Sequence, residues 1–92
     1  MNKYVIERSI PGAGGLSTQD FAAIVNKSNG VVHELGPDVQ WVVSYVTGDK
    51  IYCVYNAKNA DLVREHAKRG GFPADNISEV RRMIDPTFMQ GR

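Results

Sequence analysis

The sequence has few of the features that identify a function directly. Cys53 is the one cysteine among 92 residues, so no disulfide can form within the chain. There are two histidines, and no Cys-x-x-Cys, His-Glu-x-x-His or Gly-x-Ser-x-Gly pattern is present. These absences exclude a disulfide-stapled scaffold and leave no local motif of a zinc site or of a serine hydrolase.

Long apolar runs and an excess of charge are also missing. No apolar stretch approaches the roughly 20 residues needed to cross a bilayer, and residues 1–8 lack the apolar segment of a signal peptide. The formal net charge is +1, which gives no electrostatic reason for binding nucleic acid or an anionic membrane. We therefore expect a cytoplasmic protein with neither of these partners.

What is present is the composition of an ordinary small domain. Hydrophobic residues make up 42% and charged residues 23% of the chain, as in globular proteins generally. We expect one domain over residues 1–86, and a flexible tail over residues 87–92, where no pattern is visible. A chain of this size buries only about 60–65% of its unfolded surface, so dimerisation would add useful burial.

The order of the predicted elements indicates a fold class. Residues 18–35 have apolar side chains at helical spacing, with Ser17 as the N-terminal cap and Gly36-Pro37 as the end. Asn59 caps a second predicted helix that runs to Arg69. Strands are predicted at residues 3–9, 39–47, 50–56 and 76–84. This βαββαβ order predicts an α+β ferredoxin-like sandwich, with an antiparallel sheet and both helices on one face.

The predicted hairpin suggests how the other face is used. A tight turn at Gly48-Asp49 would pair Tyr45 with Tyr52. Strict alternation then gives one face the side chains Trp41, Val43, Tyr45, Tyr52 and Val54, and the other face Val42, Ser44, Val46, Ile51, Cys53 and Tyr55. Both faces are largely apolar, so we expect a homodimer joined through sheet faces, a dimeric α/β-barrel type of assembly with a cavity between the sheets.

Two polar residues are candidates for chemistry. His66 projects onto the buried stripe of the second helix, where it is either a hydrogen-bonded structural histidine or a ligand. Paired with Cys53 it would resemble a nucleophile and its base, but no Asn or Asp is identifiable as a third member, and we assign no catalytic residue. If Tyr4 and Ile6 face the helices, Glu7 faces the cavity. Its carboxylate would bind metal, act as a base, or form an ion pair with Arg81 or Arg82.

Several segments together carry a family resemblance that spans residues 3–86. They are residues 4–8, 10–14, 41–55 and 63–73. The chain resembles a small bacterial family of domains of unknown function that includes a cytosolic nickel-binding protein. The resemblance implies a ferredoxin-like dimer with metal sites near the interface, and the matching candidate ligands are Glu7, Tyr45 and His66. Relatives commonly have a histidine at the position of Val43, so one imidazole is missing here.

These observations leave three functional hypotheses. The first is a cytosolic homodimer that binds nickel or another divalent transition metal through Glu7, Tyr45 and His66. The alternative is a dimeric α/β-barrel enzyme or binding protein, with a small organic ligand held between the sheets by Trp41, Tyr45 and Tyr52. The third is an interaction module without a small ligand.

Overall fold

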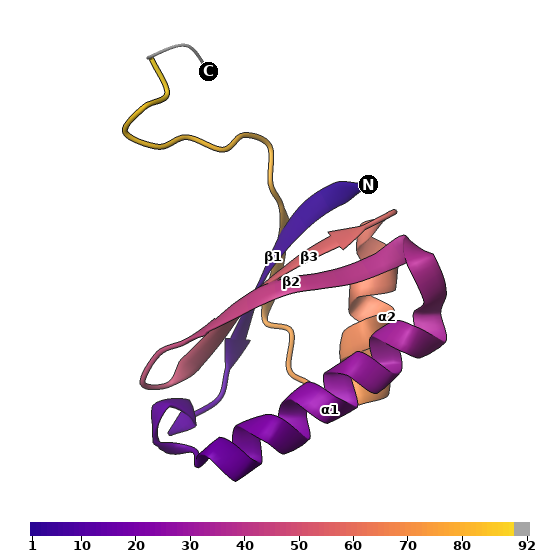
Figure 1. Ribbon diagram of the computed structural model, residues 1–92, viewed down its shortest axis with the longest axis vertical. Helices are drawn as coiled ribbons and strands as arrows, with labels where there is room; N and C mark the ends of the chain where they lie inside the picture. The colour runs from indigo at the N-terminus through magenta and orange to yellow at the C-terminus, as the bar shows by residue number, and fades with distance from the viewer. Residues whose placement is uncertain (90–92) are drawn as a thin grey trace.

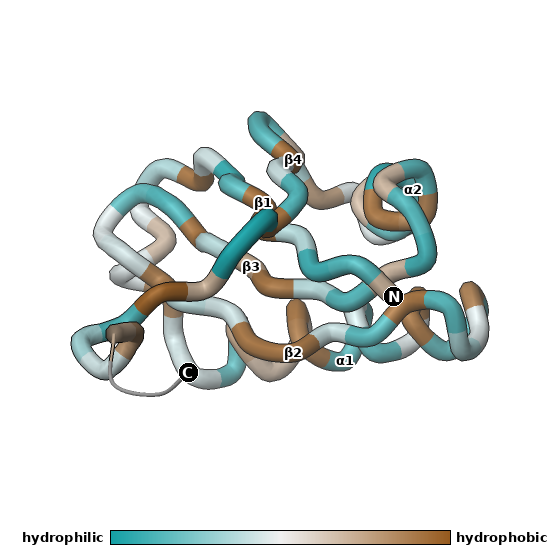
Figure 2. The backbone as a smooth tube through the Cα atoms, turned by 90° about the horizontal axis from the view of Figure 1, so that it is seen from above, coloured by the Kyte–Doolittle hydropathy of each residue, from teal (hydrophilic) through white to brown (hydrophobic). Residues whose placement is uncertain are grey.

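A four-stranded antiparallel sheet and two helices make up the computed structural model, which describes residues 1–89. The elements are β1 (Asn2–Ser9), η1 (Ala13–Gly15), α1 (Thr18–Leu35), η2 (Gly36–Asp38), β2 (Val39–Val46), β3 (Lys50–Ala57), α2 (Ala60–Gly70) and β4 (Asn76–Glu79). The strand order is β2-β3-β1-β4, as Figure 2 shows. The predicted α+β ferredoxin-like fold is confirmed.

The helices begin and end where the sequence places their caps. At the start of α1, Ser17 accepts a hydrogen bond from the backbone amide of Asp20, whose carboxylate accepts one from the amide of Ser17. At the start of α2, the Asn59 side chain accepts from the amide of Leu62. Gly71 ends α2 at a φ of 69°, which favours glycine. Both helices lie on the same side of the sheet (Figure 1).

The core lies between the sheet and the helices. Alternate residues of β1 and β3 are buried on this side, and the residues between them are half-buried on the other. Ile6, Tyr55 and Val63 are almost completely removed from solvent. Each such apolar side chain contributes about 1.5–3 kcal/mol to folding. We call the side of the sheet away from the helices the open face; Val5, Glu7, Val43, Tyr45, Tyr52 and Val54 lie on it.

A β-bulge in β2 overturns one prediction. Val43 pairs with Val54 and Tyr45 with Tyr52, as expected, but Trp41 pairs with Tyr55. An extra residue, Val42, therefore breaks the strict alternation and moves Trp41 to the helix side. There the indole N–H of Trp41 donates to Ser44 Oγ at 2.9 Å. The prediction that Trp41 shares a face with Tyr45 and Tyr52 is wrong.

The last strand is shorter than predicted, ending at Glu79 rather than at residue 84. It pairs with β1, and Glu79 already stands opposite Tyr4. After Val80, whose amide donates to the carbonyl of Lys3, β1 has almost no residues left to pair with. The chain then runs away from the sheet (Figure 1). Of the predicted tail, residues 90–92 lie outside the described part.

No helix within residues 1–89 combines the length and the apolar character needed to cross a membrane.

Candidate functional sites on the two faces of the sheet

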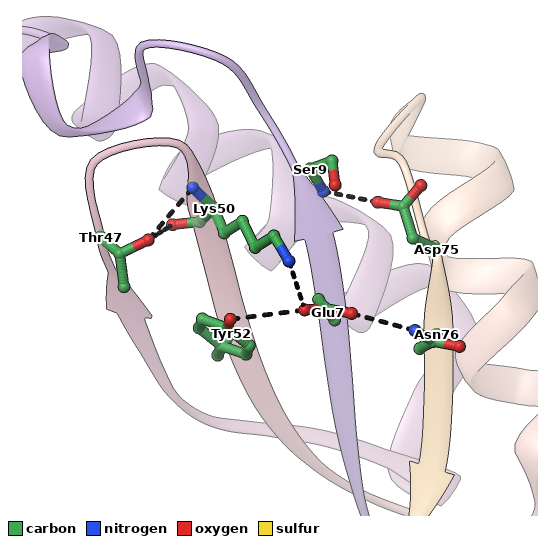
Figure 3. A network of polar contacts seen from close by, with 7 residues as sticks. All are labelled: Glu7, Ser9, Thr47, Lys50, Tyr52, Asp75 and Asn76. Carbon is green, nitrogen blue, oxygen red and sulfur yellow. Dashed lines mark hydrogen bonds and ion pairs between the residues drawn. The ribbon is translucent and has the colours of Figure 1, made fainter.

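Glu7 is the one carboxylate on the open face of β1, opposite Tyr52 of β3. Its side chain accepts hydrogen bonds from Lys50 Nζ at 2.8 Å, Asn76 Nδ2 at 2.9 Å and Tyr52 Oη at 3.4 Å (Figure 3). The ion pair considered for Glu7 thus exists, but with Lys50 instead of Arg81 or Arg82. Lys50 is a diagonal neighbour across the β1–β3 ladder, within reach of a long side chain.

These contacts keep the carboxylate of Glu7 charged. The hydrogen bond from Lys50 lowers the pKa of Glu7 below its ordinary value, and the bond from Asn76 and the charge of Lys50 act in the same direction. The hydrogen bond and charge of Glu7 in turn raise the pKa of Lys50. The open face therefore carries the Glu7 carboxylate as one half of an ion pair with Lys50.

Tyr45 and Tyr52 stand side by side next to this carboxylate. They form a cross-strand pair between β2 and β3, and 62% of Tyr45 is exposed. Val43 is also exposed on this face. The structure thus brings Glu7, Tyr45 and Tyr52 onto one face, with phenol and carboxylate oxygens but no imidazole.

His66 lies on the opposite side, in the core between the two helices and the sheet. Its Nε2 is hydrogen-bonded to Ser28 Oγ of α1 at 3.0 Å, and its ring stands against Tyr55 and Phe72 at centroid distances of 4.9 and 5.8 Å. Burial lowers the pKa of His66 to about 4, and the positive charge of Arg8 acts in the same direction. His66 is therefore neutral near pH 7, and its Nδ1 has no hydrogen-bond partner among the described residues 1–89.

The three predicted metal ligands are consequently not in one place. Glu7 and Tyr45 lie on the open face, and His66 lies on the helix side. Within residues 1–89 no cluster of three or more histidine, cysteine, aspartate or glutamate side chains is arranged to hold a metal. Cys53 is also on the helix side, where its sulfur accepts from Ser44 and Arg8.

A pocket of about 200 Å³ lies on the helix side, between α1 and the sheet. Its walls are mainly apolar and include Trp41, Phe21 and Ile24. Arg8 lines it too, although 97% of this residue is shielded from solvent. The sequence reasoning missed Arg8; the signal was an arginine in register with Tyr4 and Ile6, on the core side of β1.

Comparison with known proteins found a family and a fold. A family model described as nickel responsive protein SCO4226-like matches residues 4–80. The crystal structure of SCO4226 from Streptomyces coelicolor A3(2) superimposes with a TM-score of 0.74 at 19% sequence identity, covering 89% of this chain and 99% of that chain. At this identity the structural likeness shows the fold alone. No curated protein matches the chain.

Proposed function

Because the chain belongs to the family of nickel responsive SCO4226-like proteins, we propose that it is a cytoplasmic homodimer that binds a divalent transition metal, with nickel as the ion indicated by the family's name. The observation that carries the proposal is the carboxylate of Glu7, paired with Lys50, on the sheet face opposite the two helices. In this proposal the open face serves as the dimer interface and Glu7 as a metal ligand.

The exposure of the open face supports the dimer. Val43 and Tyr45 of β2 are exposed there. A contiguous apolar surface on a small domain is a typical sign of a protein interface. A second copy placed face to face would bury this strand, and would enclose the Glu7 carboxylates of both copies in a common space.

The metal proposal requires the second copy. One chain offers Glu7 and Tyr45, with Asn76 and Tyr52 as further oxygen donors, which is too little for a complete set of ligands around a transition metal. Two Glu7 side chains would supply two carboxylate ligands, each exchanging its ion pair with Lys50 for the metal. Nickel favours nitrogen donors, so we expect weaker binding than in relatives that have a histidine at the position of Val43.

Nickel titration of untagged protein tests the role of Glu7. We expect Ni²⁺ to bind the dimer in a calorimetric titration, and the substitution Glu7→Gln to weaken binding at least tenfold, because it removes the charge and retains the shape. Glu34→Gln is the matched control, since Glu34 is an exposed carboxylate of α1, far from the open face. Equal affinity in wild type and Glu7→Gln would overturn the proposal.

His66 is tested by the same titration. Since it lies on the helix side, it would hold an ion only at a second site, separate from Glu7. A lower stoichiometry in His66→Gln, with the affinity of the remaining site unchanged, would reveal such a site. An unchanged stoichiometry would assign nickel binding to the open face alone.

A further inference from the structure

Arg8 is a buried charge without a counter-charge. It is 3% exposed, and no carboxylate within residues 1–89 forms an ion pair with it. Its Nη1 donates to the carbonyl of Pro73 at 2.6 Å and its Nε to Cys53 Sγ at 3.4 Å. Within residues 1–89 its Nη2 is buried and has no hydrogen-bond partner of good geometry, although the guanidinium lies near the Tyr55 hydroxyl. Proteins rarely bury a guanidinium in this way, because an uncompensated charge in the interior is costly.

The contacts of Arg8 within the chain do not explain its charge. The bond to Pro73 ties β1 to the segment after α2, and the guanidinium lies over the ring of Phe72 at 5.4 Å. A neutral hydrogen-bond donor would serve the first contact, and an apolar chain would fill the space beside the ring. Neither contact neutralises the positive charge or uses Nη2. The described residues 1–89 therefore leave the positive charge of Arg8 without a carboxylate partner.

The pocket beside Arg8 has the size and lining of a ligand site. Its volume is about 200 Å³, somewhat larger than the cavity of about 150 Å³ known to hold benzene. Aromatic and branched aliphatic side chains, such as Phe21, Ile24 and Trp41, form most of its wall. Val25 and Val46 line the pocket and are also exposed, so they mark its mouth between α1 and the edge strand β2.

The polar groups of the pocket further restrict the class of ligand that it can bind. Besides Arg8 they are Ser28, Ser44 and the Tyr55 side chain, none of which carries a charge at neutral pH. The pocket therefore has one positive charge, a few neutral polar groups and an otherwise apolar wall. A cation would be repelled, and a dianion such as a phosphate monoester would bring more negative charge than Arg8 offsets. A monoanion with an apolar body matches both properties, and the planar fork of a guanidinium suits a carboxylate.

We propose that the pocket between α1 and the sheet binds a small apolar monocarboxylate, an aromatic or branched aliphatic acid of about ten non-hydrogen atoms, with Arg8 as the group that pairs with its carboxylate. The apolar body lies against Phe21, Ile24 and Trp41. This site is on the opposite side of the sheet from Glu7, so it is independent of the metal proposal.

The hydrogen bond between Ser28 and His66 links the pocket to the core. Ser28 lines the pocket and is bonded to His66 Nε2. The positive charge of Arg8 disfavours protonation of His66. A bound carboxylate would offset this charge, so ligand binding is expected to shift the titration of the His66 ring toward higher pH. The ring signals of His66 in an NMR titration therefore report on occupancy.

The first test compares charged and neutral probes of one shape. Benzoate, phenylacetate and 4-methylpentanoate are titrated into the untagged protein and followed by NMR, each against its own amide. We expect at least one carboxylate to perturb the signals of Trp41 and His66 saturably, and its amide to bind at least tenfold more weakly. Equal affinity for acid and amide, or no saturable binding of any acid up to 10 millimolar, about the weakest affinity of interest for so small a ligand, would overturn the proposal.

Two variants separate binding from folding. Arg8→Met retains the length of the side chain and removes the charge; we expect it to lose the preference for acid over amide, and to melt at a higher temperature than wild type without ligand. Val25→Trp should block the mouth, with Ala22→Trp, exposed on α1 but outside the pocket, as its control. Retained acid binding in Arg8→Met, or a lower melting temperature of that variant, would assign Arg8 a structural role instead.

Discussion

Arg8 and His66 are two basic side chains in the core, and the structure treats them differently. His66 is neutral because burial lowers its pKa to about 4, and its Nε2 is satisfied by Ser28. Arg8 cannot lose its proton in a protein, so its charge remains. His66 therefore makes the stability of the core depend on pH, and Arg8 gives the core a positive charge that can pair with an anion.

The neutral state of His66 predicts a loss of stability in mild acid. The unfolded chain binds a proton at His66 near pH 6.5, whereas the folded chain does so only near pH 4. The stability that neutral His66 contributes is therefore fully present above pH 6.5, and it is lost as the pH falls toward 4. We expect the free energy of unfolding to fall by about 1–2 kcal/mol between pH 6.5 and 5, measured by urea denaturation.

His66→Gln should flatten this pH dependence, and His33→Gln, at an exposed position of α1, should retain it. The lowered pKa of Glu7 affects stability at lower pH, where this carboxylate begins to be protonated in the unfolded chain. The loss of stability above pH 5 is therefore attributed to His66. An unchanged slope in His66→Gln would contradict the assignment.

The sequence alone predicts the positions of some of these residues and not of others. Period-two alternation correctly put Glu7 on the face opposite Tyr4 and Ile6, and helical periodicity correctly buried His66. The partner of Glu7 was missed because Lys50 is 43 positions away and is brought near by strand register. Arg8 was overlooked because an arginine in a strand is ordinarily read as solvent-facing, and its lack of a carboxylate partner is visible only in three dimensions.

At the scale of elements, the short β2–β3 turn is held by the loop that precedes α1. The amide of Gly14 in η1 donates to the carbonyl of Gly48 at 3.0 Å, and that of Gly12 to the carboxylate of Asp49 at 2.9 Å. This loop is rich in glycine, with Gly12, Gly14 and Gly15 in four successive residues. The structure shows that it docks onto the turn, so at least Gly14 is there for close approach of two backbones.

This close approach predicts unequal effects of two neighbouring substitutions. A Cβ at Gly14 would lie 2.9 Å from the carbonyl oxygen of Thr47, whereas a Cβ at Gly15 would meet nothing within 4 Å. We expect Gly14→Ala to lower the free energy of unfolding by about 1–3 kcal/mol, as overpacking generally does. Gly15→Ala is the control and should change it by less than about 0.5 kcal/mol. Similar denaturation midpoints for the two variants would contradict the docking of this loop.

The strands also show which structural features an alternating sequence pattern cannot predict. The pairing of Tyr45 with Tyr52 follows from the two-residue turn and is confirmed. The bulge at Val42 was not predictable, because Val42 and Val43 are equally compatible with either face and alternation carries no sign of an extra residue. The bulge places Trp41 at the pocket instead of on the open face. An organic ligand held jointly by Trp41, Tyr45 and Tyr52, as predicted, is therefore not possible within one chain. The end of β4 depends on the length of β1, which no local pattern in residues 76–84 encodes.

At the scale of the whole molecule, the two faces of the sheet have different chemistry. The helix side holds a pocket with one positive charge, and the open face carries the Glu7–Lys50 ion pair beside the exposed side chains of Val43 and Tyr45. Beyond β4, Met83 and Ile84 are exposed on a segment that runs away from the sheet. A second copy would cover the open face without blocking the pocket, since the mouth lies between α1 and β2.

The proposed dimer is tested by placing a charge in the centre of this surface. Tyr45 is exposed in the single chain, so Tyr45→Asp should leave the fold intact, but in a face-to-face dimer it would bury unpaired carboxylates in an apolar contact. We expect sedimentation velocity to give a dimer for wild type and a monomer for Tyr45→Asp, with an unchanged far-ultraviolet circular dichroism spectrum. Ala22→Asp places the same charge on the exposed side of α1 and should remain dimeric. A monomeric wild type, or a dimeric Tyr45→Asp, would show that the open face is not the interface; the metal site built on two Glu7 carboxylates would then be excluded, whereas the pocket of Arg8 would stand unchanged.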